Sequence, residues 1–170
     1  MLAPVGSLQV VTPEGGIAAT KAAAEFGTMH VVSSLTEPSL EEIAASASNP
    51  KVFQLYVDGD WAWVEDIVGR AKQAGFVALC LTVDTALDSR RERPMLHRYV
   101  RPTRRVRRDP SYQASLTWEA MDRIKELAGL PFMLKGVATA EDAALAVEHG
   151  VDVIWVSTTA GASSTTVWVL

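Results

Sequence analysis

The chain of 170 residues has one cysteine, no long apolar run and no signal-peptide pattern at its N-terminus. Cys80 lies inside the apolar run FVALCLTV, so it has no partner for an intrachain disulfide and is expected to be a buried, reduced thiol. No window approaches the roughly 18 apolar residues of a membrane helix. These absences favour a cytoplasmic domain that is neither secreted nor membrane-spanning.

Several ligand-binding motifs are also missing. Neither GxGxxG after a first strand nor GxxxxGK[ST] occurs, which excludes the common dinucleotide and nucleoside-triphosphate phosphate loops. The three histidines, His30, His97 and His149, share no metal-ligand spacing, so no metal site is expected. The net charge of −4 gives no global reason to expect nucleic acid or an anionic membrane as a partner.

The chain does contain an alternation of short apolar runs with segments of helical period. This alternation is typical of βαβ units around a parallel sheet. We expect strands buried on both faces at residues 29–34, 51–57, 76–84, 131–136 and 152–157. We expect crossover helices within residues 13–27, 38–47, 60–75, 117–129 and 139–150. An incomplete strand is expected at the start, and the pattern is interpreted as cut at both ends.

Polar side chains gather where these strands end: Ser33, Ser34, Gln54, Tyr56, Thr82, Asp84, Lys135 and Ser157. In a (β/α)8 barrel the carboxyl ends of the strands build the active site, whereas an open doubly wound sheet binds ligands at one switch in strand order. A distribution over every strand end favours the barrel. The predicted fold class is therefore α/β, a partial (β/α)8 TIM barrel.

Motifs in a fixed order add a family resemblance. APVGSLQ, FQLYV, LTVDT, RRE and LKGV follow one another in a way that resembles the FMN-dependent α-hydroxy-acid oxidases and dehydrogenases, the group of glycolate oxidase, L-lactate dehydrogenase and mandelate dehydrogenase. The resemblance covers residues 2–157. It implies that this chain supplies the end of strand 1 through strand 6 of the barrel. It also implies FMN as cofactor and oxidation of an (S)-2-hydroxy acid to a 2-oxo acid.

The resemblance assigns roles to the strand-end residues. Lys135 would stabilise the negative charge of a reduced flavin near its N1 atom. Tyr56 and Arg91 would hold the substrate, because a guanidinium suits a carboxylate, and Asp84 would orient a catalytic histidine. The whole set expected to contact FMN is Ala3, Pro4, Ser33, Gln54, Thr82, Lys135 and Ser157. From the residues alone, these could also be ordinary polar groups near strand ends, and Asp84 could cap a loop.

The chain departs from the family after VDVIWVS. There the resemblance implies asparagine, histidine, two small residues, arginine and glutamine, with the histidine as base and the arginine on the substrate carboxylate. Thr158 and Thr159 stand at the first two positions and Ala162 at the arginine position. Threonine is no base near neutral pH, and alanine cannot bind a carboxylate. We therefore expect an inactive member of the family. The alternative is a non-catalytic fragment that acts as a binding or complementing subunit.

A shifted reading frame explains this tail. The family-like string SNHGGRQLDD, written in codons ending in C or G and with one A deleted from the asparagine codon, reads STTAGASSTT, as residues 157–166 do. We therefore divide the chain into a partial barrel at 1–157 and a non-family tail at 158–170. The alternative is a genuine tail of small residues.

Residues 90–108 hold nine arginines and two prolines with no helical apolar period, which predicts a long basic loop over residues 88–116 within the barrel. The residues leave open whether this loop is solvated or contacts an anionic surface or partner. The absence of an aromatic platform and a recognition helix argues against nucleic acid. The expected partners are a small 2-hydroxy acid and either a second copy or a complementing chain.

Overall fold

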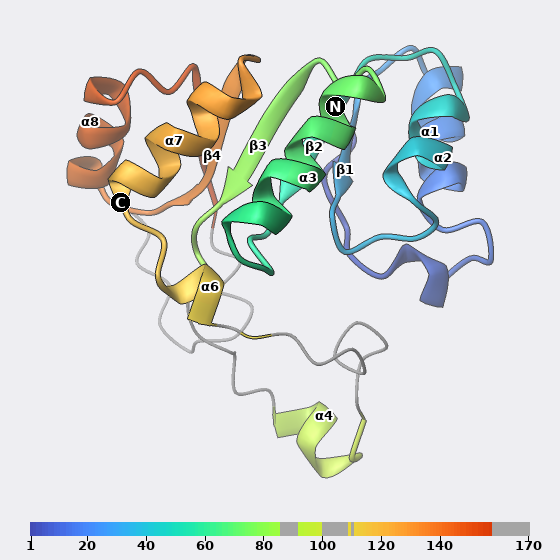
Figure 1. Ribbon diagram of the computed structural model, residues 1–170. Coiled ribbons are helices and arrows are strands. Elements are labelled where there is room, and N and C mark those ends of the chain that lie inside the picture. The colour runs from blue at the N-terminus through green and yellow to red at the C-terminus, as the bar shows by residue number, and fades with distance from the viewer. Residues whose placement is uncertain (86–91, 100–108, 110, 158–170) are drawn as a thin grey trace.

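A parallel sheet of five strands organises the molecule. The computed structural model describes residues 1–85, 92–99, 109 and 111–157 (Figure 1). The strands lie in the order β1-β2-β3-β4-β5, at His30–Ser33, Lys51–Leu55, Ala78–Thr82, Phe132–Val137 and Val153–Val156. All neighbouring pairs are parallel. The five predicted strands are confirmed, each within two residues at either end.

The five predicted crossover helices are present, and each precedes a strand of the sheet. They are α1, α2, α3, α7 and α8, at Gly16–Glu25, Leu40–Ala45, Trp61–Gln73, Trp118–Ala128 and Ala140–Glu148. Side-chain caps fix where four of them begin. Asp60, Thr117 and Thr139 accept backbone amides in the first turns of α3, α7 and α8. Ser39 and Glu42 form a reciprocal capping box at α2.

Three short helices were not predicted. A 3-10 turn, η1, covers Leu8–Val10. Two more, α4 at Glu92–Leu96 and α6 at Ser111–Ala114, lie within the segment predicted as loop, so that prediction is wrong there. Helices of one turn show little periodicity, and Glu92 favours α4 by placing a negative charge at its positive end. The rest of residues 86–110, apart from 92–99 and 109, lies outside the described residues.

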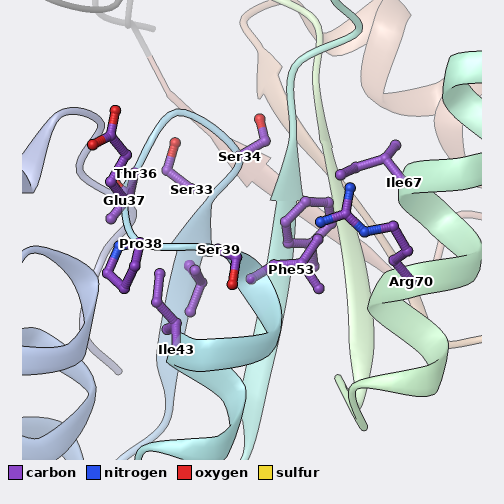
Figure 2. Close-up of a pocket in the computed structure, with 12 residues that line it drawn as sticks. Ser33, Ser34, Thr36, Glu37, Pro38, Ser39, Ile43, Phe53, Ile67 and Arg70 are labelled. Carbon is purple, nitrogen blue, oxygen red and sulfur yellow. The ribbon is translucent and has the colours of Figure 1, made fainter.

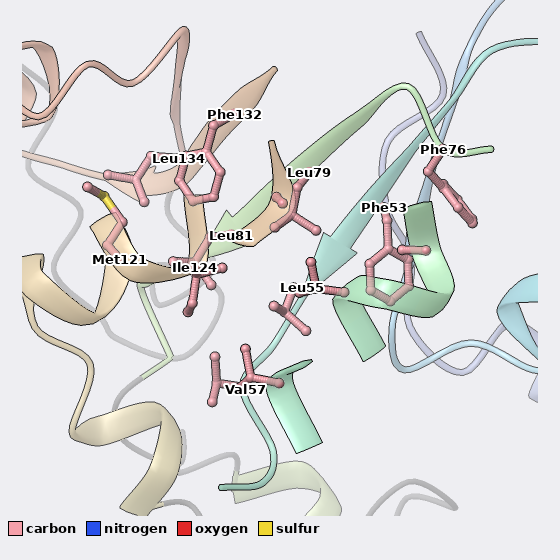
Figure 3. Packing of buried hydrophobic residues seen from close by; sticks show 14 of the residues in the cluster. Phe53, Leu55, Val57, Phe76, Leu79, Leu81, Met121, Ile124, Phe132 and Leu134 are labelled. Atoms are coloured by element: carbon pink, nitrogen blue, oxygen red, sulfur yellow. The ribbon is translucent and has the colours of Figure 1, made fainter. Parts of the chain in front are cut away.

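The helices cover one face of the sheet and form the main core with it. Figure 3 shows how aromatic and aliphatic side chains of the strands meet those of α7. Phe53 contacts Phe76 edge-on with ring centroids 5.4 Å apart. The strand side chains on this face alternate with those on the other, as expected for period two. The buried strand residues of this layer are Val32, Phe53, Leu55, Leu79, Leu81, Phe132, Leu134 and Val137.

The two edges of the sheet differ from the centre. Leu2 forms an isolated parallel bridge with His30, so the incomplete strand expected at the start is a single bridge. At the other edge, Val153 and Val156 of β5 are 44% and 73% exposed. The prediction that this strand is buried on both faces is wrong, because β5 pairs only with β4 within the described residues. Among these residues, no helix is both long and apolar enough to cross a membrane.

Candidate functional site

The register of the sheet brings the predicted strand-end residues onto one face. Ser33 aligns with Gln54, and Thr82 aligns with Lys135. Aligned residues of neighbouring parallel strands point to the same side. Between these two rows lie Leu55 and its neighbours, which face the helices. The polar residues therefore share the face that the helices leave uncovered, at the carboxyl ends of the strands.

Hydrogen bonds join these side chains across the strands. The Gln54 Nε2 atom donates to Thr82 Oγ1 over 2.6 Å, and the Lys135 Nζ atom donates to Ser157 Oγ over 2.9 Å. Gln54 and Thr82 are buried, and Lys135 is 8% exposed. Burying an ammonium group is costly unless polar groups surround it. Its Nζ atom also lies 5.9 Å from the centre of the Trp155 ring, which attracts a cation.

Tyr56 stands next to this polar set. Burial, followed by electrostatic repulsion from Asp84 and Cys80, raises the pKa of its phenol to about 12, and a hydrogen bond with Gln54 offsets part of this rise. The backbone amide of Tyr56 donates to Ser34 Oγ over 3.1 Å. The phenol therefore stays neutral at physiological pH and can donate a hydrogen bond to an oxygen atom of a ligand.

Asp84 is held against the end of β4. Gly136 has φ +105°, and a Cβ atom added there would come within 2.6 Å of the Asp84 Cβ. Only glycine allows both this backbone conformation and this close approach. The amide of Val83 also donates to the Lys135 carbonyl over 2.9 Å. The glycine of LKG thus has a steric role that sequence reasoning missed, although its place after a buried lysine could have indicated it.

The first residues of the chain reach the same end of the sheet. Ala3 and Pro4 follow the bridge between Leu2 and His30, at the start of β1, and lead along this strand. The Thr36 hydroxyl donates to the Val5 carbonyl over 2.6 Å and ties this segment to the loop after β1. The segment that contains Ala3 and Pro4 thus runs along β1 toward the end that carries Ser33.

Arg91, Thr158, Thr159 and Ala162 lie outside the described residues. Gln113, in contrast, was missed by sequence reasoning. Its Oε1 atom accepts the Val57 amide over 2.8 Å, and its Nε2 atom donates to the Thr82 carbonyl over 2.7 Å. No periodicity in the surrounding segment marks it, so its position could not be found from the sequence.

A separate cavity of about 270 Å³ lies on the helix side of the sheet, between α2 and α3. Figure 2 shows Ile67 and Arg70 lining it from α3, opposite Ser39 and Ile43 of α2. Arg70 donates to both carboxylate oxygens of Glu41, over 2.7 and 3.1 Å, so its charge already has a partner. Of the strand-end residues described above, Ser33 and Ser34 line this cavity, whereas Gln54, Thr82 and Lys135 do not. Among the described residues, no group of three or more His, Cys, Asp or Glu side chains could hold a metal ion.

The chemistry of the polar set suits one kind of ligand. It combines an amide, three hydroxyls and an ammonium group on one face: Gln54, Ser33, Thr82, Ser157 and Lys135. Amides and hydroxyls can match the alternating donors and acceptors at the edge of a flavin ring, and the ammonium favours negative charge on it. These residues fit FMN. A set of this kind at the carboxyl ends of a parallel β/α sheet is the arrangement expected of a flavin-binding barrel protein.

Comparison with known proteins agrees with this class. The profile of the family described as FMN-dependent dehydrogenase matches residues 1–166, and the chain belongs to this family. The chain is 37% identical over 179 residues to glycolate oxidase of Spinacia oleracea, with 92% of this chain and 48% of that protein covered. Glycolate oxidase 1 of Zea mays is 36% identical, and the match again covers 92% of this chain and 48% of that protein.

Solved structures give the fold. A mandelate oxidase with 3,3-difluoro-2-hydroxy-3-phenylpropionic acid has a TM-score of 0.83 and 35% identity, covering 94% of this chain and 47% of its own. A Pediococcus acidilactici protein assigned as a lactate oxidase has a TM-score of 0.87 and 27% identity, covering 97% and 48%. These neighbours are TIM-barrel oxidases, so the sheet is part of a (β/α)8 barrel, as predicted.

The cofactor of the family is FMN, in agreement with the prediction; one similar structure, of a mandelate oxidase variant, holds a C4a-OH-FMN adduct. That structure has a TM-score of 0.81 and 34% identity, with 94% of this chain and 48% of its own covered. The chain spans about half the length of the curated relatives it matches.

Proposed function

We propose that this chain carries the flavin-ring side of an oxidase for a 2-hydroxy acid, but that it does not turn over such an acid by itself. The observation that carries this proposal is Thr159 at the position that the resemblance gives to the catalytic histidine. Oxidising a 2-hydroxy acid to a 2-oxo acid removes two electrons and two protons, one proton from the α-carbon and one from the hydroxyl group. A base must accept a proton, and a threonine hydroxyl is not one near neutral pH.

The residues of the polar set would hold the ring of FMN. Gln54, Thr82 and Ser33 would bond its polar edge, with the backbone at Ala3 and Pro4 beside it. Bound FMN would supply the acceptor for the two electrons that leave the substrate. The Lys135 ammonium would stabilise the negative charge that this transfer places on the ring, and Ser157 would keep that ammonium in position.

The substrate would lie next to the same set. The neutral phenol of Tyr56 would donate a hydrogen bond to a substrate oxygen atom. Arg91 would bind the substrate carboxylate as a planar fork, and Asp84 would orient the base where a base is present. Ala162 cannot provide the second carboxylate contact that the resemblance expects from an arginine. Loss of the base and loss of this contact would both lower the turnover of the substrate.

The direct test is a turnover assay of the 170-residue chain. Glycolate, L-lactate and (S)-mandelate are supplied with excess FMN, and the 2-oxo acid is measured. We expect no product above background, because general-base catalysis alone contributes about 10²–10⁴-fold. Full-length spinach glycolate oxidase serves as the positive control. Turnover by the unmodified chain would contradict the proposal.

We also propose that the chain binds FMN only weakly. In barrels of this kind the phosphate site is usually formed by the loops after strands 7 and 8. The described residues reach the sixth strand position of the family barrel and contain no such site. We expect little flavin to stay with the chain through gel filtration. Absorbance near one FMN per chain would overturn this part.

A second candidate role is that of a complementing subunit. The exposure of Val153 and Val156 at the edge of β5 favours it, because an open edge with apolar side chains can pair with a further strand. Mixing the chain with the C-terminal half of spinach glycolate oxidase should give a one-to-one complex in gel filtration. Two separate peaks would argue against this role.

The proposed location is the cytoplasm. Cys80 is a buried free thiol, as expected in a reducing compartment. Fractionation of cells that express the chain, with antibody detection, tests this. Recovery of the chain in an organelle fraction would reject it.

A further inference from the structure

Gln113 of α6 occupies a particular place between two strand ends. Its side chain is 8% exposed, and both ends of its amide are used. The Oε1 atom accepts the amide of Val57, the residue after Tyr56, over 2.8 Å. The Nε2 atom donates to the carbonyl of Thr82, the last residue of β3, over 2.7 Å. One side chain therefore bridges the ends of β2 and β3.

Both bridged positions adjoin residues of the polar set. The Thr82 hydroxyl accepts a hydrogen bond from Gln54 Nε2 and its carbonyl accepts one from Gln113 Nε2, so the two glutamines bind the same residue. The Tyr56 amide donates to the Ser34 hydroxyl, and the amide of the next residue, Val57, donates to Gln113. We propose that Gln113 is a positioning residue that fixes Thr82 and Tyr56 for FMN and substrate; this inference rests on the proposed function.

A side-chain amide suits both of these backbone partners. The Val57 amide requires an acceptor and the Thr82 carbonyl requires a donor, and glutamine offers both on one planar group. A carboxylate would keep the acceptor and lose the donor. An aliphatic side chain would leave both backbone groups without a partner in a buried place.

The bridge also links a distant segment to the site. Residues 83–117 connect β3 to α7, and Asp84 at the start of this segment packs against Gly136. Gln113 fixes the returning end of the same segment to the ends of β2 and β3.

The first arm of the test needs no flavin. Amide hydrogen exchange by NMR is compared for the parent chain, Gln113→Leu, Gln113→Glu and the control Gln73→Leu, which alters an exposed glutamine of α3. We expect at least tenfold faster exchange of the Val57 amide in Gln113→Leu, with protection kept in Gln113→Glu and in the control. Unchanged exchange of Val57 in Gln113→Leu would overturn the bridge.

The second arm measures FMN affinity by fluorescence titration. We expect about tenfold weaker binding for Gln113→Leu, as for one lost hydrogen bond, and an intermediate loss for Gln113→Glu, with the flavin absorbance maxima shifted from those of the parent complex. Equal affinities and spectra for all four chains would overturn the positioning role. If the parent chain binds no FMN while the first arm succeeds, the proposed function fails and the bridge stands.

Discussion

Two buried lysines at opposite ends of the sheet show how similar burial can serve different purposes. Lys51, at the start of β2, is 6% exposed, and its Nζ atom donates to the carbonyls of Ala47 and Asn49. Lys135, near the end of β4, is 8% exposed and donates to the Ser157 hydroxyl. Main-chain carbonyls are fixed partners, whereas a side-chain hydroxyl can rotate to accommodate a ligand. The type of partner, and not burial, separates the structural lysine from the candidate functional one.

The surroundings of the two lysines extend this contrast. Near Lys51, the Thr20 hydroxyl donates to the Gly16 carbonyl and lies 2.8 Å from His30 Nδ1, so that nitrogen carries a hydrogen and donates it to the hydroxyl oxygen. Such a closed network serves stability. Near Lys135, the aligned residues Thr82 and Trp155 belong to the open face of the sheet.

The largest expected effect comes from repairing the reading frame, which would complete the carboxyl end. Restoring one nucleotide at codon 158 should open a frame that encodes an asparagine-histidine pair, a following arginine and two further βα units. We expect its product to oxidise a 2-hydroxy acid at least about 10²-fold faster than the 170-residue chain. Thr159→His with Ala162→Arg should not suffice in the 170-residue chain. The absence of such a segment from the neighbouring DNA would refute the frameshift.

At the amino end, His30 should make stability depend on pH. Burial, and then the charge of Lys51, lower its pKa from 6.5 to about 4. The unfolded chain therefore binds a proton that the folded chain does not accept between these values. The stabilisation is complete above pH 6.5 and is lost as the pH falls toward 4. Between pH 7 and pH 5 we expect a loss of about 2 kcal/mol, from about 1.4 kcal/mol per pKa unit.

Urea unfolding of the parent chain, His30→Gln and the control His97→Gln at both pH values measures this. His97 is exposed, so its variant should keep the slope of the parent chain. An equal pH dependence in His30→Gln and the parent would show that His30 does not carry the effect.

The two lysines should respond differently to the same substitution. Lys51→Met leaves two carbonyls without their donor, and we expect it to lower the free energy of unfolding by about 1–2 kcal/mol. Lys135→Met should lower it less, because the Ser157 hydroxyl, at the edge of the sheet, can bond water instead. Chemical denaturation at pH 7 compares them. A larger loss for Lys135→Met would reverse the structural assignment.

The smallest effect is expected on the outer, helical layer. Arg70 of α3 bonds Glu41 of α2, but both side chains are more than 40% exposed. Exposed ion pairs contribute little, so Arg70→Gln should change the free energy of unfolding by only about 0.5 kcal/mol. Thermal unfolding in low and high salt checks this, and a change several times larger would show that the neighbouring cavity depends on the pair.

The sequence predicted the elements that hydrophobic period and capping define. All five strands and all five crossover helices are in place, since runs such as FVALC and caps such as Asp60 act locally. Gln54 and Thr82 were also expected near strand ends, where the structure has them. The short helices α4 and α6 did not, because one turn carries no period. The exposure of β5 was missed because it depends on what lies beside the strand and not on its own residues.

For the site, the sequence could predict only those residues that lie at strand ends or match the motifs of the family. Tyr56 and Asp84 could be named from the sequence. The contact of Asp84 with Gly136 could not, because it depends on the positive φ angle of the glycine. Gln113 lies 31 residues from Thr82 in the sequence and is brought to it by the return of a long segment. Such contacts arise from tertiary structure.

The central claim is that the polar set at the carboxyl ends is a flavin-ring site, and an FMN titration of three chains tests it most directly. Fluorescence quenching is measured for the parent chain, Lys135→Met and Lys51→Met at matched folded concentration. The account predicts weak, saturable binding by the parent, at least about tenfold weaker binding by Lys135→Met and an affinity within about twofold of the parent for Lys51→Met. No saturable binding by the parent, or the same affinity in both variants, would contradict it.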